Sequence, residues 1–122
     1  MRLDKYDDNY EHGLPVVRHM GLEGYICANG FDHKDAQVVC KESGYAGGIS
    51  YDSYDHQSGI TSRLHWLSNV DCNGDESFLI RCNGLDWGNM TGCNVHVQAA
   101  VFCYRQTGLS SAFLVLFPYI IN

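Results

Sequence analysis

The sequence predicts a small α+β domain held together by disulfide bonds, and three observations lead to that class. One amphipathic helical segment, residues 31–45, lies among several stretches of strand-forming residues. The 13 glycines and only 2 prolines favour tight turns over long helices. Six cysteines are an even number and many for a cytosolic protein. At 122 residues, the chain has the length of one domain with one modest core.

The helical segment has a beginning, an apolar face and an end that can be identified. Asp32 is suited to cap the first turn, because its carboxylate can accept the free amide hydrogens there. Asp35 adds negative charge where the helix dipole favours it. Gly44 is suited to end the helix in the left-handed conformation. One stripe of the helix is apolar and is expected to face the core: Ala36, Val39 and Cys40.

Four stretches around the helix are typical of strands: residues 14–20, 24–27, 64–70 and 97–103. Pro15 should confine the first of them to an edge or an end of the sheet, because proline has no amide hydrogen to donate. Residues 75–82 could form one short helical segment with Phe78 and Leu79 turned inward. Residues 51–56 are interpreted as a polar, aromatic loop.

The cysteines indicate an oxidising, extracellular environment. No pair has the C-x-x-C spacing, which argues against a zinc ribbon or a thioredoxin-like redox site. Spacing alone does not choose among the possible pairings. A bond between Cys72 and Cys82 would be sterically easy, since they flank a short turn. Cys40 and Cys103 both face inward, so a bond between them would tie the helix to the sheet.

The charge balance argues against nucleic acid as a partner. The net charge is −6, and the eight lysines and arginines are scattered along the chain. Proteins that bind nucleic acid through phosphates need clustered positive charge. A hydrophobic content of 45% with 18% charged residues is ordinary for a folded domain.

Eight short motifs follow one another along most of the chain: Tyr25-Ile-Cys27, Gly30-Phe-Asp32, Asp35-Ala-Gln-Val-Val-Cys40, Gly44-Tyr-Ala-Gly-Gly48, Trp66-Leu67, Val70-Asp-Cys72, Gly74-Asp-Glu-Ser77 and Trp87-Gly88. In order and spacing this series resembles a scavenger receptor cysteine-rich (SRCR) domain of the six-cysteine group A type. The resemblance implies a curved antiparallel β-sheet that cradles one α-helix. It also implies three disulfides, Cys27–Cys93, Cys40–Cys103 and Cys72–Cys82. We assign residues 1–104 to this domain and residues 105–122 to a C-terminal apolar tail of unknown role.

The sequence departs from the resembled family at positions that bear on metal binding. Members often hold calcium through acidic residues, but the corresponding positions here are neutral: Ala28, Asn29, Ser68, Asn69, Val97 and Gln98. Calcium prefers several oxygen ligands, above all carboxylates. We therefore expect the family's calcium site to be absent or much weakened, and no cofactor. Asp71, Asp75 and Glu76 are close in sequence, and we interpret them as a solvated acidic turn rather than a cation site. Glu23 stands where the family usually has a tryptophan.

The candidate functional residues indicate recognition rather than catalysis. No nucleophile has a recognisable base partner, and oxidised cysteines cannot act as nucleophiles. Tyr51, Tyr54 and Asp55 form our candidate partner surface, because exposed tyrosines offer large contact areas. The alternative is that these tyrosines lie back on the sheet. Asn89-Met-Thr91 is an N-glycosylation sequon.

Two functions follow from this interpretation. The first is an extracellular, non-catalytic recognition module of scavenger-receptor type, secreted or part of a membrane-protein ectodomain. It would bind a protein or glycan partner and meet a membrane only through an anchor of its parent protein. The second, by resemblance, is an accessory domain of a larger enzyme such as a serine protease or a lysyl-oxidase-like protein. A lone structural domain without a ligand is a third idea.

From the two ends of the chain we expect this sequence to be a piece of a longer protein. Residues 1–12 contain no apolar stretch of the kind found in a secretory signal. Residues 109–122 contain an apolar run interrupted by Pro118, which falls short of a membrane span. This run could be a truncated transmembrane segment, a strand added to the sheet, or an artefact of the gene model.

Overall fold

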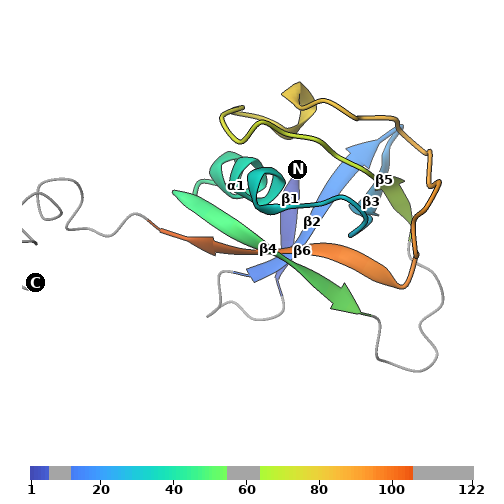
Figure 1. Ribbon diagram of the computed structural model, residues 1–122, viewed down its shortest axis with the longest axis horizontal. Helices are drawn as coiled ribbons and strands as arrows, with labels where there is room; N and C mark the ends of the chain where they lie inside the picture. The colour runs from blue at the N-terminus through green and yellow to red at the C-terminus, as the bar shows by residue number, and fades with distance from the viewer. Residues whose placement is uncertain (6–11, 55–63, 106–122) are drawn as a thin grey trace, which may run out of the picture.

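A computed structural model describes residues 1–5, 12–54 and 64–105 of the chain. These residues form an α+β domain in which one α-helix packs on a curled sheet (Figure 1). The elements, in order, are β1 (Arg2–Lys5), β2 (His12–His19), β3 (Leu22–Ile26), α1 (His33–Glu42), β4 (Gly47–Tyr54), β5 (His65–Leu67), a 3-10 turn (Leu79–Arg81) and β6 (Val97–Tyr104).

The sheet is mixed rather than purely antiparallel. Its strand order is β4-β6-β2-β3-β5, and β1 pairs with β2 outside this path. All pairs are antiparallel except β3 with β5. These two strands are separated in sequence by α1 and β4, and such a long connection permits parallel pairing. The predicted α+β class is confirmed, with this one correction to the strand directions.

The helix begins at the predicted cap. Asp32 Oδ1 accepts hydrogen bonds from the backbone N–H groups of Lys34 and Asp35, at 3.0 and 3.2 Å. Asp35 Oδ2 accepts one from the backbone N–H of Asp32 at 2.8 Å, which completes a reciprocal capping box. Gly44 has φ 95°, the left-handed conformation expected at the helix end. The buried face of α1 packs against β4 and β6 (Figure 1).

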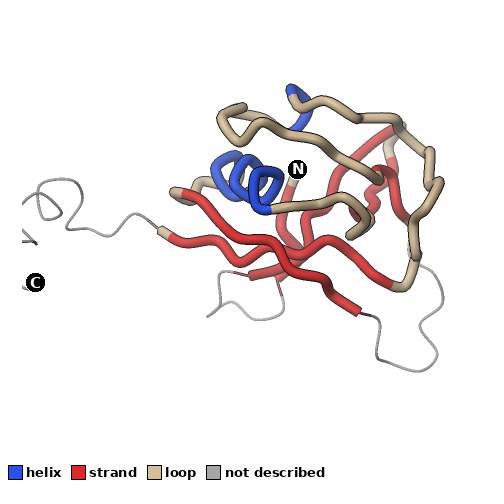
Figure 2. The backbone as a smooth tube through the Cα atoms, in the orientation of Figure 1, coloured by secondary structure: helices blue, strands red, loops and turns tan. Residues whose placement is uncertain are grey.

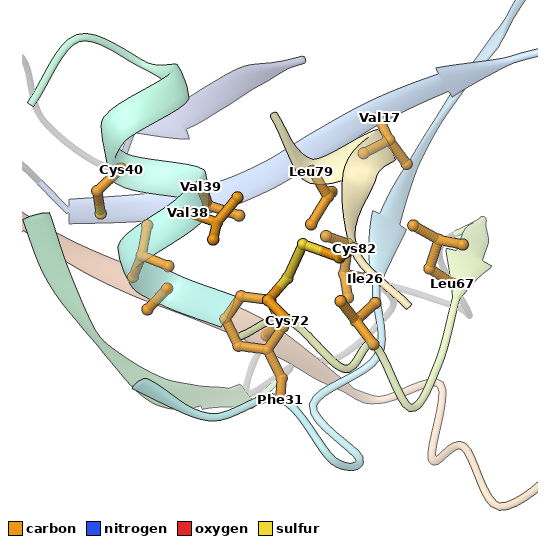
Figure 3. Packing of buried hydrophobic residues seen from close by; sticks show 14 of the residues in the cluster. Val17, Ile26, Phe31, Val38, Val39, Cys40, Leu67, Cys72, Leu79 and Cys82 are labelled. Atoms are coloured by element: carbon orange, nitrogen blue, oxygen red, sulfur yellow. A yellow bond between two sulfur atoms is a disulfide. The ribbon is translucent and has the colours of Figure 1, made fainter. Parts of the chain in front are cut away.

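The core lies between α1 and the sheet and is completed by the long connection between β5 and β6, which passes beside α1 (Figure 2). The domain contains three disulfides, Cys27–Cys93, Cys40–Cys103 and Cys72–Cys82. They are the same three pairs that the resemblance implied. The first two join different parts of the fold, and the third closes a loop within the connection between β5 and β6. Figure 3 shows Cys72 and Cys82 packed among Ile26, Phe31 and Leu79. The Cys40–Cys103 and Cys72–Cys82 disulfides therefore form part of the core as well as crosslinks.

Several local expectations need correction. β2 is a central strand, not an edge strand. Pro15 lies between the segment of β2 that pairs with β6 and the segment that pairs with β3, so no bond to either strand is lost. Residues 75–82 form only a short 3-10 turn. Leu79 is buried there as expected, but Phe78 is 51% exposed. Residues 51–54 continue β4 instead of forming a loop.

No helix in the described ranges has the length and apolar character needed to cross a membrane. The apolar run of the C-terminal tail lies outside the described residues, which end at position 105.

Candidate ligand-recognition surface

An open, polar hollow of about 440 Å³ lies where three segments distant in sequence meet. The first is the loop after β3, the second is the end of β4, and the third is the loop that leads into β6. The residues that line it are Cys27, Ala28, Asn29, Gly30, Asp52, Tyr54, Gly92, Asn94 and Val97. The Cys27–Cys93 disulfide joins the first and third of these segments covalently.

The loop after β3 is held in place by Asn69. Asn29 Nδ2 donates to Asn69 Oδ1 at 2.9 Å, and the backbone N–H of Asn69 donates to the carbonyl of Asn29 at 3.0 Å. Gly30 has φ 78°, and a β-carbon there would lie 3.0 Å from Asn69 Oδ1. Glycine is therefore the residue that allows this close approach.

β4 divides the predicted partner residues between its two faces. Side chains alternate along a strand, so Asp52 and Tyr54 share the face that borders the hollow, whereas Tyr51 lies on the opposite face. Tyr51 Oη lies 2.9 Å from His12 Nδ1, within hydrogen-bond distance. Tyr54 is 54% exposed. Asp55 lies outside the described residues.

Sequence reasoning did not assign three lining residues to the partner surface: Asp52, Asn29 and Asn94. Of these, Asn29 was considered only as a calcium position. The alternation of side chains in β4 could have grouped Asp52 with Tyr54, had residues 51–54 been recognised as strand. Asn29 and Asn94 follow Cys27 and Cys93 by two residues and one residue, so the disulfide that the resemblance implied could have grouped them.

The residues at the resembled calcium positions do not fit a calcium ion. The amides of Asn29 and Asn69 bond to each other. Gln98 is buried, and its Nε2 donates to the carbonyl of Val95 at 3.1 Å. Among the residues that line the hollow, Asp52 supplies the carboxylate, and calcium wants several such oxygen ligands. We derive no calcium-dependent chemistry from this surface.

The acidic turn near Cys72 has a structural role. Glu76 accepts hydrogen bonds from the backbone N–H groups of Asn73 and Gly74, at distances from 2.8 to 3.1 Å. These bonds, above all the one from Asn73, lower the pKa of Glu76. Potential ligand atoms of Cys72, Glu76 and Cys82 lie within 4.8 Å of one another. However, the two sulfurs form a disulfide, so neither is a thiolate that could bind a metal.

Two half-buried tryptophans pack against the core near the turn between β2 and β3. The His19 ring stacks on Trp87 at 4.4 Å and meets Trp66 edge-on at 4.9 Å. Trp66 Nε1 donates to the carbonyl of Leu22 at 2.9 Å. These contacts fix the aromatic rings against the end of the sheet.

Glu23, which stands where the resembled family has a tryptophan, forms a cross-strand ion pair. Arg2 Nε and Nη2 donate to its two carboxylate oxygens at 2.9 and 3.0 Å. The hydrogen bonding from Arg2 is the main cause that lowers the pKa of Glu23. The ion pair links β1 to β3 across β2.

The sequon asparagine is exposed in the loop between the 3-10 turn and β6. Asn89 Nδ2 donates to Asp86 Oδ2 at 2.8 Å, and Thr91 Oγ1 donates to Asn89 Oδ1 at 2.7 Å. Both side chains of the sequon therefore lie at the surface beside one another.

Comparison with known proteins identifies the fold. The model of the scavenger receptor cysteine-rich domain matches residues 7–104. Macrophage receptor MARCO from Mus musculus is 39% identical over 75% of this chain and 17% of its own length. CD5 antigen-like from Homo sapiens is 34% identical over 79% of this chain and 28% of its own length. Lysyl oxidase homolog 4 from Bos taurus is 31% identical over 79% of this chain and 12% of its own length. The chain thus spans less than a third of each relative.

Solved structures agree with these sequence relatives. The dimeric form of the SRCR domain of mouse MARCO superposes with a TM-score of 0.65 and 33% identity, covering 81% of this chain and 92% of that one. The third SRCR domain of murine neurotrypsin gives a TM-score of 0.63 and 29% identity, covering 84% and 92%. With its three disulfides and these relatives, the domain is extracellular, in a secreted or membrane-bound protein.

Proposed function

This chain belongs to the scavenger receptor cysteine-rich family, and from that premise we propose that it is a non-catalytic recognition module that binds an extracellular protein or glycan at the polar hollow. Tyr54 and Asp52 form one wall of this site, and Asn29 and Asn94 form the others. Tyr51, on the opposite face of β4, is not part of it.

One observation carries this proposal: a disulfide fastens two of the three walls together. Cys27 lines the hollow itself, and its partner Cys93 lies between the lining residues Gly92 and Asn94. A site whose walls are crosslinked loses little conformational entropy when a ligand binds, which favours affinity. Polar side chains on a rigid frame are suited to recognition.

The chemistry of the hollow favours neutral or cationic groups. The amides of Asn29 and Asn94 and the hydroxyl of Tyr54 are of the kinds that hydrogen-bond sugar hydroxyls or peptide groups. Asp52 and the net charge of −6 would repel a polyanion. We therefore expect sulfated polysaccharides to bind poorly at physiological ionic strength.

The test is a binding screen with the folded, oxidised domain against an array of neutral glycans and a panel of immobilised extracellular-matrix proteins, with heparin as the polyanion probe. A hit should be weakened about 5- to 30-fold by Tyr54→Ala, since an aromatic contact that ligand binding buries contributes on the order of 1–2 kcal/mol. Tyr51→Ala, on the other face of β4, is the matched control and should leave binding unchanged. Binding to heparin alone, or equal losses in the two variants, would refute the proposed site.

A second candidate function rests on the relatives that carry an enzyme name. The match to lysyl oxidase homolog 4 spans 12% of that protein, so an SRCR domain forms a small part of it. This chain could likewise be an accessory domain of a larger extracellular enzyme. Sequencing the full-length transcript decides between the two: a downstream catalytic domain supports the accessory role, and further SRCR repeats or a membrane anchor support the receptor role.

A further inference from the structure

The chain contains three Asn-Gly sequences that could modify themselves: Asn29-Gly30, Asn73-Gly74 and Asn83-Gly84. In such a pair the backbone nitrogen of glycine can attack the side-chain amide carbon of asparagine, since glycine has no side chain to hinder the approach. The reaction needs the asparagine amide to turn freely and the glycine nitrogen to be unengaged. The structure treats the three pairs differently.

The first pair is immobilised. Asn29 Nδ2 donates to Asn69 Oδ1 at 2.9 Å, and the Asn29 carbonyl accepts from the backbone N–H of Asn69 at 3.0 Å. Gly30 lies directly against Asn69. The amide of Asn29 must leave this bond before its carbon can be attacked.

In the second pair the attacking nitrogen is engaged. The Gly74 N–H donates to Glu76 Oε1 at 2.9 Å, and the preceding N–H of Asn73 donates to the same carboxylate. The Gly74 nitrogen therefore has to leave a charge-assisted hydrogen bond before it can act as a nucleophile.

In the third pair the backbone is restrained, but within the part of the chain that the structure describes the two reacting groups make no hydrogen bond. The backbone of Asn83 is fixed, because its N–H and carbonyl exchange hydrogen bonds with the backbone of Asp71 at 3.1 and 3.0 Å. Its side chain is exposed, and within the described ranges neither the Asn83 amide nor the Gly84 N–H has a hydrogen-bond partner. Ring closure has to turn the Asn83–Gly84 peptide, so it opens the bond from Asp71 to the Asn83 carbonyl, and Gly84 also packs against the Asn69 carbonyl. The first pair has comparable backbone restraints, and the third pair differs in that, among the described residues, neither its amide nor its attacking nitrogen has a hydrogen bond of its own to break.

We propose that Asn83 is a site of spontaneous deamidation in the folded domain. The Gly84 nitrogen gives up its proton and forms a bond to Asn83 Cγ, and the bond from Cγ to the amide nitrogen breaks. The departing NH2 group takes up a proton and leaves as ammonia, and a five-membered succinimide remains. Water then adds to one of its two carbonyl carbons. The ring opens to aspartate if the original backbone bond is kept, or to isoaspartate if the chain continues through Cγ.

Deamidation adds a negative charge next to Asp71. A new carboxylate at position 83 stands directly opposite Asp71 in the antiparallel bridge, one residue after Cys82. Like charges placed opposite each other are destabilising. Isoaspartate also adds a methylene group to the backbone where Asn83 and Asp71 exchange hydrogen bonds, so this bridge should weaken.

The test is to age the folded, oxidised protein in mildly alkaline buffer at body temperature, then reduce, digest and map it by mass spectrometry. An isoaspartyl methyltransferase assay detects the isomer. Asn83 should convert at least about fivefold faster than Asn29 or Asn73, since breaking one hydrogen bond slows a step by about that factor. Reduced and denatured protein is the reference, in which the three pairs should convert at similar rates.

Two variants sharpen the result. Asn83→Gln should abolish the signal at this position, because the longer side chain forms the ring far less readily. Glu76→Ala releases the Gly74 nitrogen and should raise conversion at Asn73 while leaving Asn83 unchanged. Equal rates at the three pairs in the folded protein, or faster loss at Asn29 or Asn73, would overturn the proposal.

Discussion

Asp35 Oδ1 accepts a hydrogen bond from the backbone N–H of Cys72 at 2.8 Å, although the two residues are 37 positions apart. Asp35 is 1% exposed, and its other oxygen completes the capping box at the start of α1. One carboxylate thus joins the helix to the loop that the Cys72–Cys82 disulfide closes. Burial is the larger effect and raises the pKa of Asp35 to about 6, although the backbone hydrogen bonds to this carboxylate lower the pKa.

The stability of the domain should therefore depend on the protonation of Asp35. A folded-state pKa above the unfolded value means that the folded state binds the proton more tightly. The stabilisation that the proton on Asp35 contributes is complete below pH 3.8, the ordinary pKa of this carboxyl group. It is lost as the pH rises through about 6, the folded-state pKa. From about pH 5 to pH 7 the loss should be about 1 kcal/mol.

This dependence is measured by denaturant unfolding with the disulfides intact. Asp35→Asn cannot ionise and should lack this component of the pH profile, while the loss of one well-oriented acceptor should cost about 1–3 kcal/mol throughout. Asp75→Asn, at an exposed position, is the matched control and should keep the native profile. Identical profiles for the native protein and Asp35→Asn would contradict the prediction.

Neighbouring glycines in β4 should respond differently to alanine. A β-carbon on Gly48 would collide with Cys40 Sγ and the Phe102 carbonyl, neither of which can move freely. Gly48→Ala should cost about 1–3 kcal/mol or more, as expected for overpacking. At Gly47 the β-carbon would meet the hydroxyl end of the half-exposed Tyr104 side chain, which can turn away.

Thermal melting of Gly48→Ala and Gly47→Ala under the same conditions checks this difference. Gly47→Ala serves as the control, since it makes the same chemical change one residue away. Equal melting temperatures for the two variants would show that the strand can shift at Gly48.

The three disulfides should contribute unequally to stability. Cys27–Cys93 and Cys40–Cys103 join residues 66 and 63 positions apart, and Cys72–Cys82 joins residues 10 apart. In the chain-entropy model each long closure stabilises by about 4 kcal/mol and the short one by about 3 kcal/mol. Paired Cys→Ala variants, compared by denaturant unfolding, test this order. Non-reducing peptide mapping should first recover these three pairs and no free thiol.

Calcium should not bind to the polar hollow with useful affinity. Calorimetric titration of the native domain should show no micromolar binding, because the amides of Asn29 and Asn69 replace carboxylates. The double change Asn29→Asp with Asn69→Asp should make thermal stability depend on calcium, since two carboxylates in contact repel without a cation. Micromolar calcium binding by the native chain would contradict this prediction.

Asn89 is expected to carry an N-linked glycan when the protein passes through a secretory pathway. Its side chain is exposed, and Thr91 Oγ1 lies 2.7 Å from Asn89 Oδ1. Expression in a secreting eukaryotic host should give a mass increase that an amidase specific for N-glycans removes. Thr91→Ala should prevent the modification while keeping Asn89 itself. If the secreted native protein carries no glycan at Asn89, the prediction is wrong.

The helix and the general class follow from local chemistry that can be recognised in the chain. Asp32, Asp35 and Gly44 act within a few residues of their partners, so their capping roles were predictable. Other features depend on distant residues. Phe78 looked like a core residue, but the tight 3-10 turn buries Leu79 and leaves Phe78 exposed. Pro15 is tolerated in a central strand because β6 pairs with the residues of β2 that precede it and β3 pairs with the residues that follow it.

By itself, the sequence determined the family, the redox environment and the single capped helix, since each rests on spacing, composition or contacts within one turn. Only the tertiary structure decided which side chains share a surface. It separated Tyr51 from Tyr54, because strand alternation sends them to opposite faces, and it brought Asp52 beside Asn29 and Asn94. The physical reason is that those walls are joined by the Cys27–Cys93 crosslink and by sheet pairing, which act between residues far apart in the chain.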